Sequence, residues 1–139
     1  EGVSKAGVID AAARLFHSAA GDEPLRLYLL LVAASVGLSA FIDNIPYVAA
    51  MLPVVQGVAA LMNGGAGIEP ELFYFGLLTG ATLGGNLTPI GASANIAAIG
   101  ILRKNGERVR TSDFLRIGVP FTLAAGLVGA GSLWLFWGV

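Results

Sequence analysis

The chain has 139 residues, of which 55% are hydrophobic and 12% are charged, and it contains a further 20 glycines. A soluble domain of this size keeps much of its surface in water and could not hide so much apolar surface, which excludes a cytosolic globular enzyme. Intrinsic disorder needs the opposite composition, and a net charge of −1 provides no electrostatic footprint for nucleic acid.

The residues that usually carry catalysis or bind metals are scarce. The chain has no cysteine and a single histidine, His17. This excludes thiolate nucleophiles and cysteine-ligated metals, and it leaves too few histidines for a histidine-rich metal site or a Ser-His-Asp triad. The chain begins with Glu1 and shows no signal-peptide pattern, so we expect a piece of a longer membrane protein.

Long apolar runs divide the chain. Asp43 is the only charged residue between positions 27 and 62, and residues 72–102 and 117–139 carry no charge. Runs of about 18 apolar residues or more are candidates for membrane spans. We predict the end of a preceding helix over residues 1–20, a helical hairpin over 25–62, a broken span over 71–102 and a last span over 118–139. Residues 111–117 are expected to form a separate capped segment at the membrane surface.

The first long run is interrupted by the sequence Asp43-Asn44-Ile45-Pro46. Pro46 lacks an amide proton and clashes with a preceding helical turn, so one helix should end near Asp43 and the next should start at Pro46. Two arrangements fit: two spans joined by a polar turn at the surface, or a re-entrant hairpin whose polar tip lies at membrane depth. Asp43 and Asn44 are then either solvated capping residues or intramembrane groups that face an ion or substrate.

The second interruption lies in a run without charge. Gly84, Gly85 and Pro89 would open several backbone hydrogen bonds, and the freed carbonyl groups could hold a small cation. The helix that restarts after Pro89 would point its positive N-terminus at the same place, which suits an anion. The alternative is a kinked helix whose polar groups only satisfy one another. We favour a binding site, because a polar break is costly to keep in lipid.

The two interruptions together define the candidate site. Asp43 and Asn44 should approach the second interruption, because the polar groups of both regions need polar partners inside a membrane. No catalytic residue is expected, and no metal other than sodium at the same residues. The candidate residues for binding a substrate or ion are Asp43, Asn44, Gly85, Asn86, Thr88, Pro89, Ser93 and Asn95.

Two further patterns concern packing and orientation. Gly76, Gly80 and Gly84 recur at every fourth position, which predicts a face that packs closely against another helix. Residues 103–116 hold five basic and two acidic side chains, and an excess of Lys and Arg marks the cytoplasmic side. We therefore expect an integral protein of the cell (inner) membrane with residues 103–116 in the cytoplasm. The loop over residues 63–70 and the C-terminus are expected outside.

Three stretches resemble the C-terminal part of the ion transporter superfamily: SAFIDNIPYVAAMLPVV, GATLGGNLTPIGASANIAAIGI and FLRIGVPFTLAAG. The sequence is most similar to arsenite/antimonite permeases, the P protein and NhaD-type sodium/proton antiporters, with citrate and divalent-anion symporters as broader relatives. The resemblance implies a carrier built from two inverted repeats, of which this chain holds most of the second. It also implies that Asp43 and Asn44 lie at a hairpin tip and that residues 85–95 lie in an unwound span.

We therefore expect an all-α membrane protein that moves a small ion or anion by alternating access. The cargo would be an arsenite-like oxyanion, sodium or protons, or a carboxylate. Sodium or a proton would be the coupling ion, without any other cofactor. The expected partners are the lipid bilayer, the N-terminal half of the same carrier and a second copy, and not nucleic acid. The alternatives are a passive channel and an intramembrane enzyme; the motif stretches hold no His, Cys or Glu and one Asp, which disfavours the enzyme.

Overall fold

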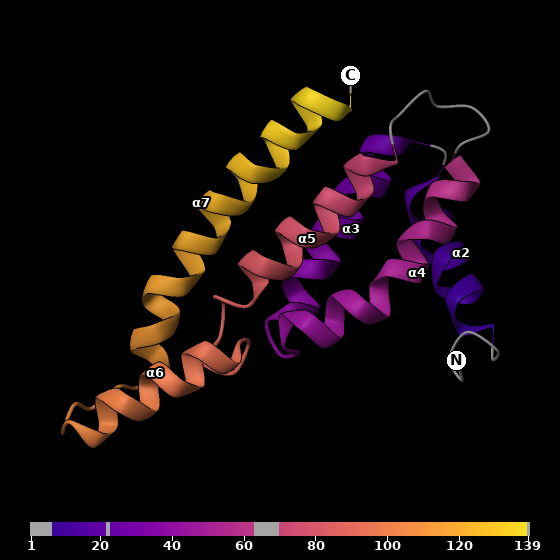
Figure 1. The fold of residues 1–139 in the computed structure, drawn as a ribbon. Helices are drawn as coiled ribbons and strands as arrows, with labels where there is room; N and C mark the ends of the chain where they lie inside the picture. The colour runs from indigo at the N-terminus through magenta and orange to yellow at the C-terminus, as the bar shows by residue number, and fades with distance from the viewer. Residues whose placement is uncertain (1–6, 22, 63–69, 139) are drawn as a thin grey trace.

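The computed structural model describes residues 7–21, 23–62 and 70–138, whose course is shown in Figure 1. These ranges contain helices and no strand, which confirms the all-α class. The part of the helix predicted over residues 1–20 that is described starts at Val8, while residues 1–6 and 63–69 lie outside the described ranges. The helices are α2 (Val8–Ala20), α3 (Pro24–Ser39), α4 (Asn44–Met62), α5 (Glu71–Gly84), α6 (Ser93–Lys104) and α7 (Thr111–Trp137).

The tightest packing joins α3 to α5, which lie side by side in Figure 1. A Cβ atom added to Gly76 would lie 2.7 Å from Cε2 of Tyr28, and one added to Gly80 would lie 2.6 Å from Cβ of Ser35. At Gly84 an added Cβ would collide with the carbonyl oxygen of Val36 in α3. These approaches are closer than carbon and oxygen atoms allow, so the seam requires residues without side chains, as the glycine spacing predicts.

The two helices of the predicted hairpin are joined by residues 40–43, but they contact each other little. Instead, α3 packs on α5 and α2, while α4 packs on α2 and α5. The predicted boundaries were wrong, because α3 ends at Ser39 and α4 already begins at Asn44. Pro46 fits inside the first turn of α4, where amide protons have no partner within the helix. The amide of Tyr47 then donates to the carbonyl oxygen of Asp43 at 3.2 Å.

Between α5 and α6 the helix is interrupted over residues 85–92. Two turns fold this segment: the amide of Leu87 donates to the carbonyl of Gly84 at 2.9 Å, and the amide of Gly91 donates to that of Thr88 at 3.2 Å. Beyond the break, α6 packs against no other described helix. Figure 1 shows it extending away from α2, α3, α4 and α5, with the start of α7 near it in the view.

The last helix, α7, is continuous over its 27 residues, about 40 Å. It begins at Thr111, so the separate segment expected over residues 111–117 and the later start at Gly118 were wrong. The reason is a local cap: the amide of Arg110 donates to Oδ2 of Asp113 at 3.2 Å, and the amide of Asp113 donates to the carbonyl oxygen of Arg110 at 3.1 Å.

By length and composition, α7 is the one helix of the described residues that could cross a membrane. The helices α3 and α4 are also apolar, but their apolar stretches are shorter. Much of the surface of α7 is an exposed apolar face, which a water-soluble monomer would not retain. The large side chains on this face are Ile117, Phe121, Leu123, Leu127, Val128, Leu135 and Phe136.

Candidate functional site

The turn before α4 meets the first residue of α6. The backbone amide of Ser93 donates to Oδ2 of Asp43 at 3.2 Å. The N-cap position of α6 is held by Ala92, whose side chain cannot accept a hydrogen bond. Asp43 therefore takes the place of the missing capping side chain from a position 50 residues away in the chain. The tip (residues 40–44) and the break (residues 85–92) thus come together, as predicted.

Two further contacts fasten the tip to the break. The hydroxyl group of Thr88 donates a short hydrogen bond to the carbonyl oxygen of Ala40. The amide group of Asn44 lies against the backbone of Gly85, where an added Cβ would come within 2.8 Å of Oδ1. Gly85 is therefore needed to let the break approach the tip.

A buried hydroxyl group lies under this contact. Oγ of Ser39, the last residue of α3, is 2.7 Å from Oδ1 of Asn44 and 2.7 Å from the carbonyl oxygen of Ala81. A serine hydroxyl has one proton, so Ser39 donates to one of these oxygens at a time. It can exchange partners without moving its backbone.

Asn95 holds the break in shape from its far end. Its Nδ2 donates to the carbonyl oxygen of Gly85 at 2.8 Å and to that of Thr88 at 3.1 Å. A third carbonyl group, that of Leu83, accepts a hydrogen bond from Oγ1 of Thr122 in α7 at 3.2 Å. Asn95 therefore supplies a donor to the carbonyl group of Gly85, which the interrupted helix would leave without a partner. The carbonyl groups of Thr88 and Leu83 receive a second donor, because they also accept from the amides of Gly91 and Asn86.

Three carbonyl oxygens converge where the break passes the tip. A Cβ added to Gly91 would lie 2.8 Å from the oxygen of Gly85, 2.9 Å from that of Ala40 and 3.1 Å from that of Ser39. Carbonyl oxygens are the negative ends of peptide dipoles, and Asp43 adds a carboxylate nearby. Oxygens of these two kinds are the ligands that small hard cations prefer.

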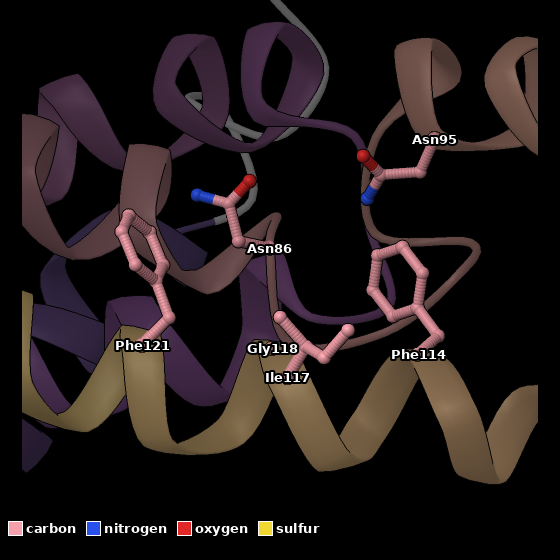
Figure 2. A pocket seen from close by; sticks show the side chains of 6 residues that line it. All are labelled: Asn86, Asn95, Phe114, Ile117, Gly118 and Phe121. Atoms are coloured by element: carbon pink, nitrogen blue, oxygen red, sulfur yellow. The ribbon is translucent and has the colours of Figure 1, made fainter.

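The opposite side of the break faces α7 across a cavity of about 350 Å³. Figure 2 shows Asn86 and Asn95 on one side of it and side chains of α7 on the other. Nδ2 of Asn86 donates to the carbonyl oxygen of Thr82 at 3.4 Å, within its own stretch of chain. The cavity is lined by Asn86, Asn95, Phe114, Ile117, Gly118 and Phe121.

The predicted residues fall into three groups. We use the name tip–break junction for the contacts that join the tip to the break and to the start of α6. Six of the predicted residues take part in it: Asp43, Asn44, Gly85, Thr88, Ser93 and Asn95. Asn86 lies on the α7 side instead. Pro89 is half-buried within the break and provides no hydrogen bond to the tip. In the described ranges, no three His, Asp or Glu side chains come together as a metal site.

Ser39 and Gly91 contribute to the junction, and Thr122 donates to the carbonyl oxygen of Leu83 at the end of α5. None of these three was among the predicted site residues. A signal for Thr122 exists in the sequence, because Gly118, Thr122 and Ala130, with Gly126 between the last two, follow the same four-residue spacing of small residues as the glycines of α5. These three are the buried residues of α7. Ser39 and Gly91 have no comparable pattern.

Comparisons with known proteins place the chain in a family. The citrate transporter family matches residues 1–138. An uncharacterized transporter of Mycobacterium tuberculosis (strain H37Rv) is 37% identical over 131 residues, which cover 94% of this chain and 30% of the relative. An uncharacterized transporter of Synechocystis is 34% identical over 147 residues, covering 97% and 32%. The human P protein is 38% identical over 101 residues, covering 73% and 12%.

No solved structure matches the chain. The chain spans about a third of the length of the bacterial relatives, and less of the P protein. The expected resemblance to the ion transporter superfamily is confirmed, including the similarity to the P protein. Because the family match extends over almost all of the sequence, the chain belongs to the citrate transporter family of membrane transport proteins.

Proposed function

We propose that the chain forms the second of two inverted repeats of a secondary carrier, and that the tip–break junction is its binding site for an ion or substrate. The carrier moves a small solute by alternating access, driven by a sodium or proton gradient. The length of the bacterial relatives supports this proposal, since the matched region occupies 30% of one of them and leaves room for a first repeat.

The observation that carries the proposal is the meeting of two helix interruptions through polar groups. Non-helical backbone is tolerated inside a membrane only where it is buried in protein or lines a water-filled cavity. The break over residues 85–92 is held by Asn95 and contacted by Asp43. Its polar groups are therefore organised by side chains from outside the break, whereas a simple kink would satisfy them locally.

The junction also has the chemistry that a carrier needs. Its contacts are hydrogen bonds that Asp43 accepts and that Thr88 and Asn95 donate, and they can be exchanged for bonds to an ion or solute at little net cost. Ser39 already faces two acceptors. The transported species belongs to one of three classes: an arsenite-like oxyanion, a carboxylate, or sodium and protons.

The arrangement in the membrane is part of the proposal. Residues 103–116 face the cytoplasm, because their positive charges disfavour translocation. The C-terminus lies outside, and the carrier resides in the cell membrane. The exposed apolar face of α7 supports contact with lipid, with the N-terminal half of the carrier or with a second copy in a homodimer.

Counterflow in proteoliposomes tests this function. The carrier that contains this chain is reconstituted, and flux of arsenite, citrate and sodium is measured with and without an opposing load of the same species. A carrier shows saturation and faster uptake into loaded vesicles. Asn95→Ala should weaken apparent affinity about tenfold or more, because two hydrogen bonds of about 1 kcal/mol each are lost from the junction.

Asn105→Ala is the matched control. Nδ2 of Asn105 bonds only to the carbonyl oxygen of Ile101 at 3.0 Å, at the far end of α6, so its loss should leave transport unchanged. Flux without saturation or counterflow would identify a channel and contradict the proposal. Normal flux in Asn95→Ala would remove the junction from the transport site.

A further inference from the structure

The positive end of α6 is already occupied by a negative group of the protein. A helix N-terminus carries about half a positive charge and unpaired amide protons, which together form a ready site for an anion. In this chain the carboxylate of Asp43 takes that place, with Oδ2 3.2 Å from the amide nitrogen of Ser93. A transported anion could reach these amides only by displacing Asp43.

The origin of this carboxylate distinguishes α6 from α7. Both helices have an aspartate oxygen 3.2 Å from a backbone amide at their start. In α7 the aspartate is Asp113 of the same first turn. In α6 the first turn has no acidic residue, and the carboxylate comes from the tip. The contact therefore determines the charge at a tertiary junction, whereas Asp113 only starts a helix.

The charge of Asp43 is not balanced by a basic side chain. No ion pair involves Asp43 in the described ranges, where the pair present is Arg26 with Glu23. On α6 the first basic residue is Arg103, about 15 Å along the helix from Ser93. From α7 the nearest charged groups in sequence to the break-facing Gly118 are Asp113 and Arg116, both exposed, and neither bonds to Asp43.

The backbone adds further negative potential. The carbonyl oxygens of Ser39, Ala40 and Gly85 converge on Gly91 beside the tip. A full negative charge set against a half positive charge leaves the junction negative, and these carbonyl groups increase that excess. Neither α4 nor α5 brings a basic residue, because residues 27–102 contain no Lys or Arg.

We propose that Asp43 is a resident anion that sets the charge selectivity of the junction. The junction rejects anions, and the species bound between tip and break is a cation or an uncharged solute. This inference rests on the proposed function, because it takes the junction to be the binding site of the carrier. It narrows the transported species, because it removes free carboxylates and charged oxyanions from the three classes above.

Thermal unfolding of the full carrier in detergent tests the selectivity. Sulfate and citrate are added as salts of a bulky organic cation at constant ionic strength. The unfolding midpoint of the wild type should rise only by the general stabilising effect of these anions, which is subtracted from the shift of every variant. Asp43→Ala empties the α6 N-terminus, so the same anions should raise its midpoint by about 2–4 °C. Asp43→Asn should show a smaller rise, because its amide oxygen can still accept the hydrogen bond from Ser93.

Asp113→Ala is the matched control, because it removes a carboxylate at the same distance from a helix start away from the junction. It should respond to the anions as the wild type does. An equal rise in Asp113→Ala would show a general property of uncapped helices and overturn the assignment to the junction. A rise in the wild type as large as that of Asp43→Ala would also overturn it.

Failure of the charge selectivity and failure of the proposed carrier function give different results. If Asp43→Ala does not fold, Asp43→Asn carries the test, and the absence of any anion-induced rise in it overturns the inference. The predicted anion pattern in a protein without counterflow refutes the proposed function and leaves the selectivity standing. Counterflow in a wild type that citrate stabilises as strongly as Asp43→Ala refutes the selectivity alone.

Discussion

The seam between α3 and α5 and the tip–break junction join neighbouring parts of the same helices by opposite means. In the seam, helix backbones touch where Gly76, Gly80 and Gly84 leave no side chain between them. The junction consists of a few hydrogen bonds among half-buried side chains, next to a helix, α6, that no other described helix supports. One contact depends on shape and the other on exchangeable polar groups.

This difference divides stability from function within one short stretch of chain. Close packing resists any separation, because each small displacement loses many contacts and no solvent group replaces them. A hydrogen bond is worth only about 1 kcal/mol net and can be replaced by an ion, a solute or water. We therefore expect the seam to stay closed while the junction opens and closes.

A large loss of stability is expected from adding one methyl group to the seam. Gly80→Ala places a carbon atom 2.8 Å from the carbonyl oxygen of Val32 and 2.6 Å from Cβ of Ser35, so α3 and α5 must separate. Overpacking of this kind costs about 1–3 kcal/mol or more, even though alanine is the better helix former. The unfolding midpoint in detergent should fall by several degrees, as measured by thermal denaturation.

Gly37→Ala is the control for this change, because a Cβ at Gly37 of α3 meets no atom within 4 Å. There the higher helix propensity of alanine acts alone, and stability should rise by about 0.5–1 kcal/mol. The two substitutions should thus have opposite signs. A stabilising Gly80→Ala would show that the seam is looser than the structure has it and would remove the basis of the comparison.

A smaller effect, of a different kind, is expected in the junction. Thr88→Val keeps the shape of the side chain but removes the hydrogen bond to the carbonyl oxygen of Ala40. Global stability should fall by about 1 kcal/mol at most. Hydrogen exchange of the amides in residues 85–92 should become about fivefold faster, because the break opens locally more often.

Thr82→Val, at an exposed position of α5, is the control. It should change neither the global stability nor the hydrogen-exchange rate of the amides in residues 85–92. If Thr88→Val lowered the global midpoint as strongly as Gly80→Ala, the junction would belong to the rigid core. The proposed division between a closed seam and an exchangeable junction would then be wrong.

The sequence predicts the parts of the fold that depend on single residue types. Pro46, Gly85 and Pro89 act on their own backbone, so the two interruptions could be located without tertiary information. The glycine seam was predicted from spacing alone. The start of α7 was missed, because the change from charged to apolar residues near Arg116 suggested a boundary. Helix capping by Asp113, farther upstream, decides where the helix begins.

The candidate site could be predicted as a region but not as a set of contacts. Polar groups at two interruptions in apolar stretches had to meet, which brought Asp43 towards Ser93. Which atom faces which depends on the angles between helices, and these follow from packing over the whole chain. Asn86 therefore ended on the α7 side, although it lies beside Gly85 in sequence. Whether the tip lies at membrane depth stays a prediction.

Two substitutions of Tyr28 separate the polar from the steric contribution of one side chain in the seam. Tyr28 is fully buried, with its ring against Gly76 and its hydroxyl group donating to the carbonyl oxygen of Ala130 in α7 at 3.0 Å. Tyr28→Phe removes only this hydrogen bond, and the carbonyl group of Ala130 keeps its place in the helical ladder of α7. Stability measured by thermal denaturation should fall by about 1 kcal/mol.

Tyr28→Ala, the companion variant, removes the ring as well and should cost about 3–5 kcal/mol, as for other large buried aromatic side chains. The ratio of the two losses measures how much of the seam depends on shape. If Tyr28→Phe alone lost as much stability as Tyr28→Ala, the seam would be held by its hydrogen bond to α7. It would then be as exchangeable as the junction, and rigid packing could no longer explain why only the junction is free to move.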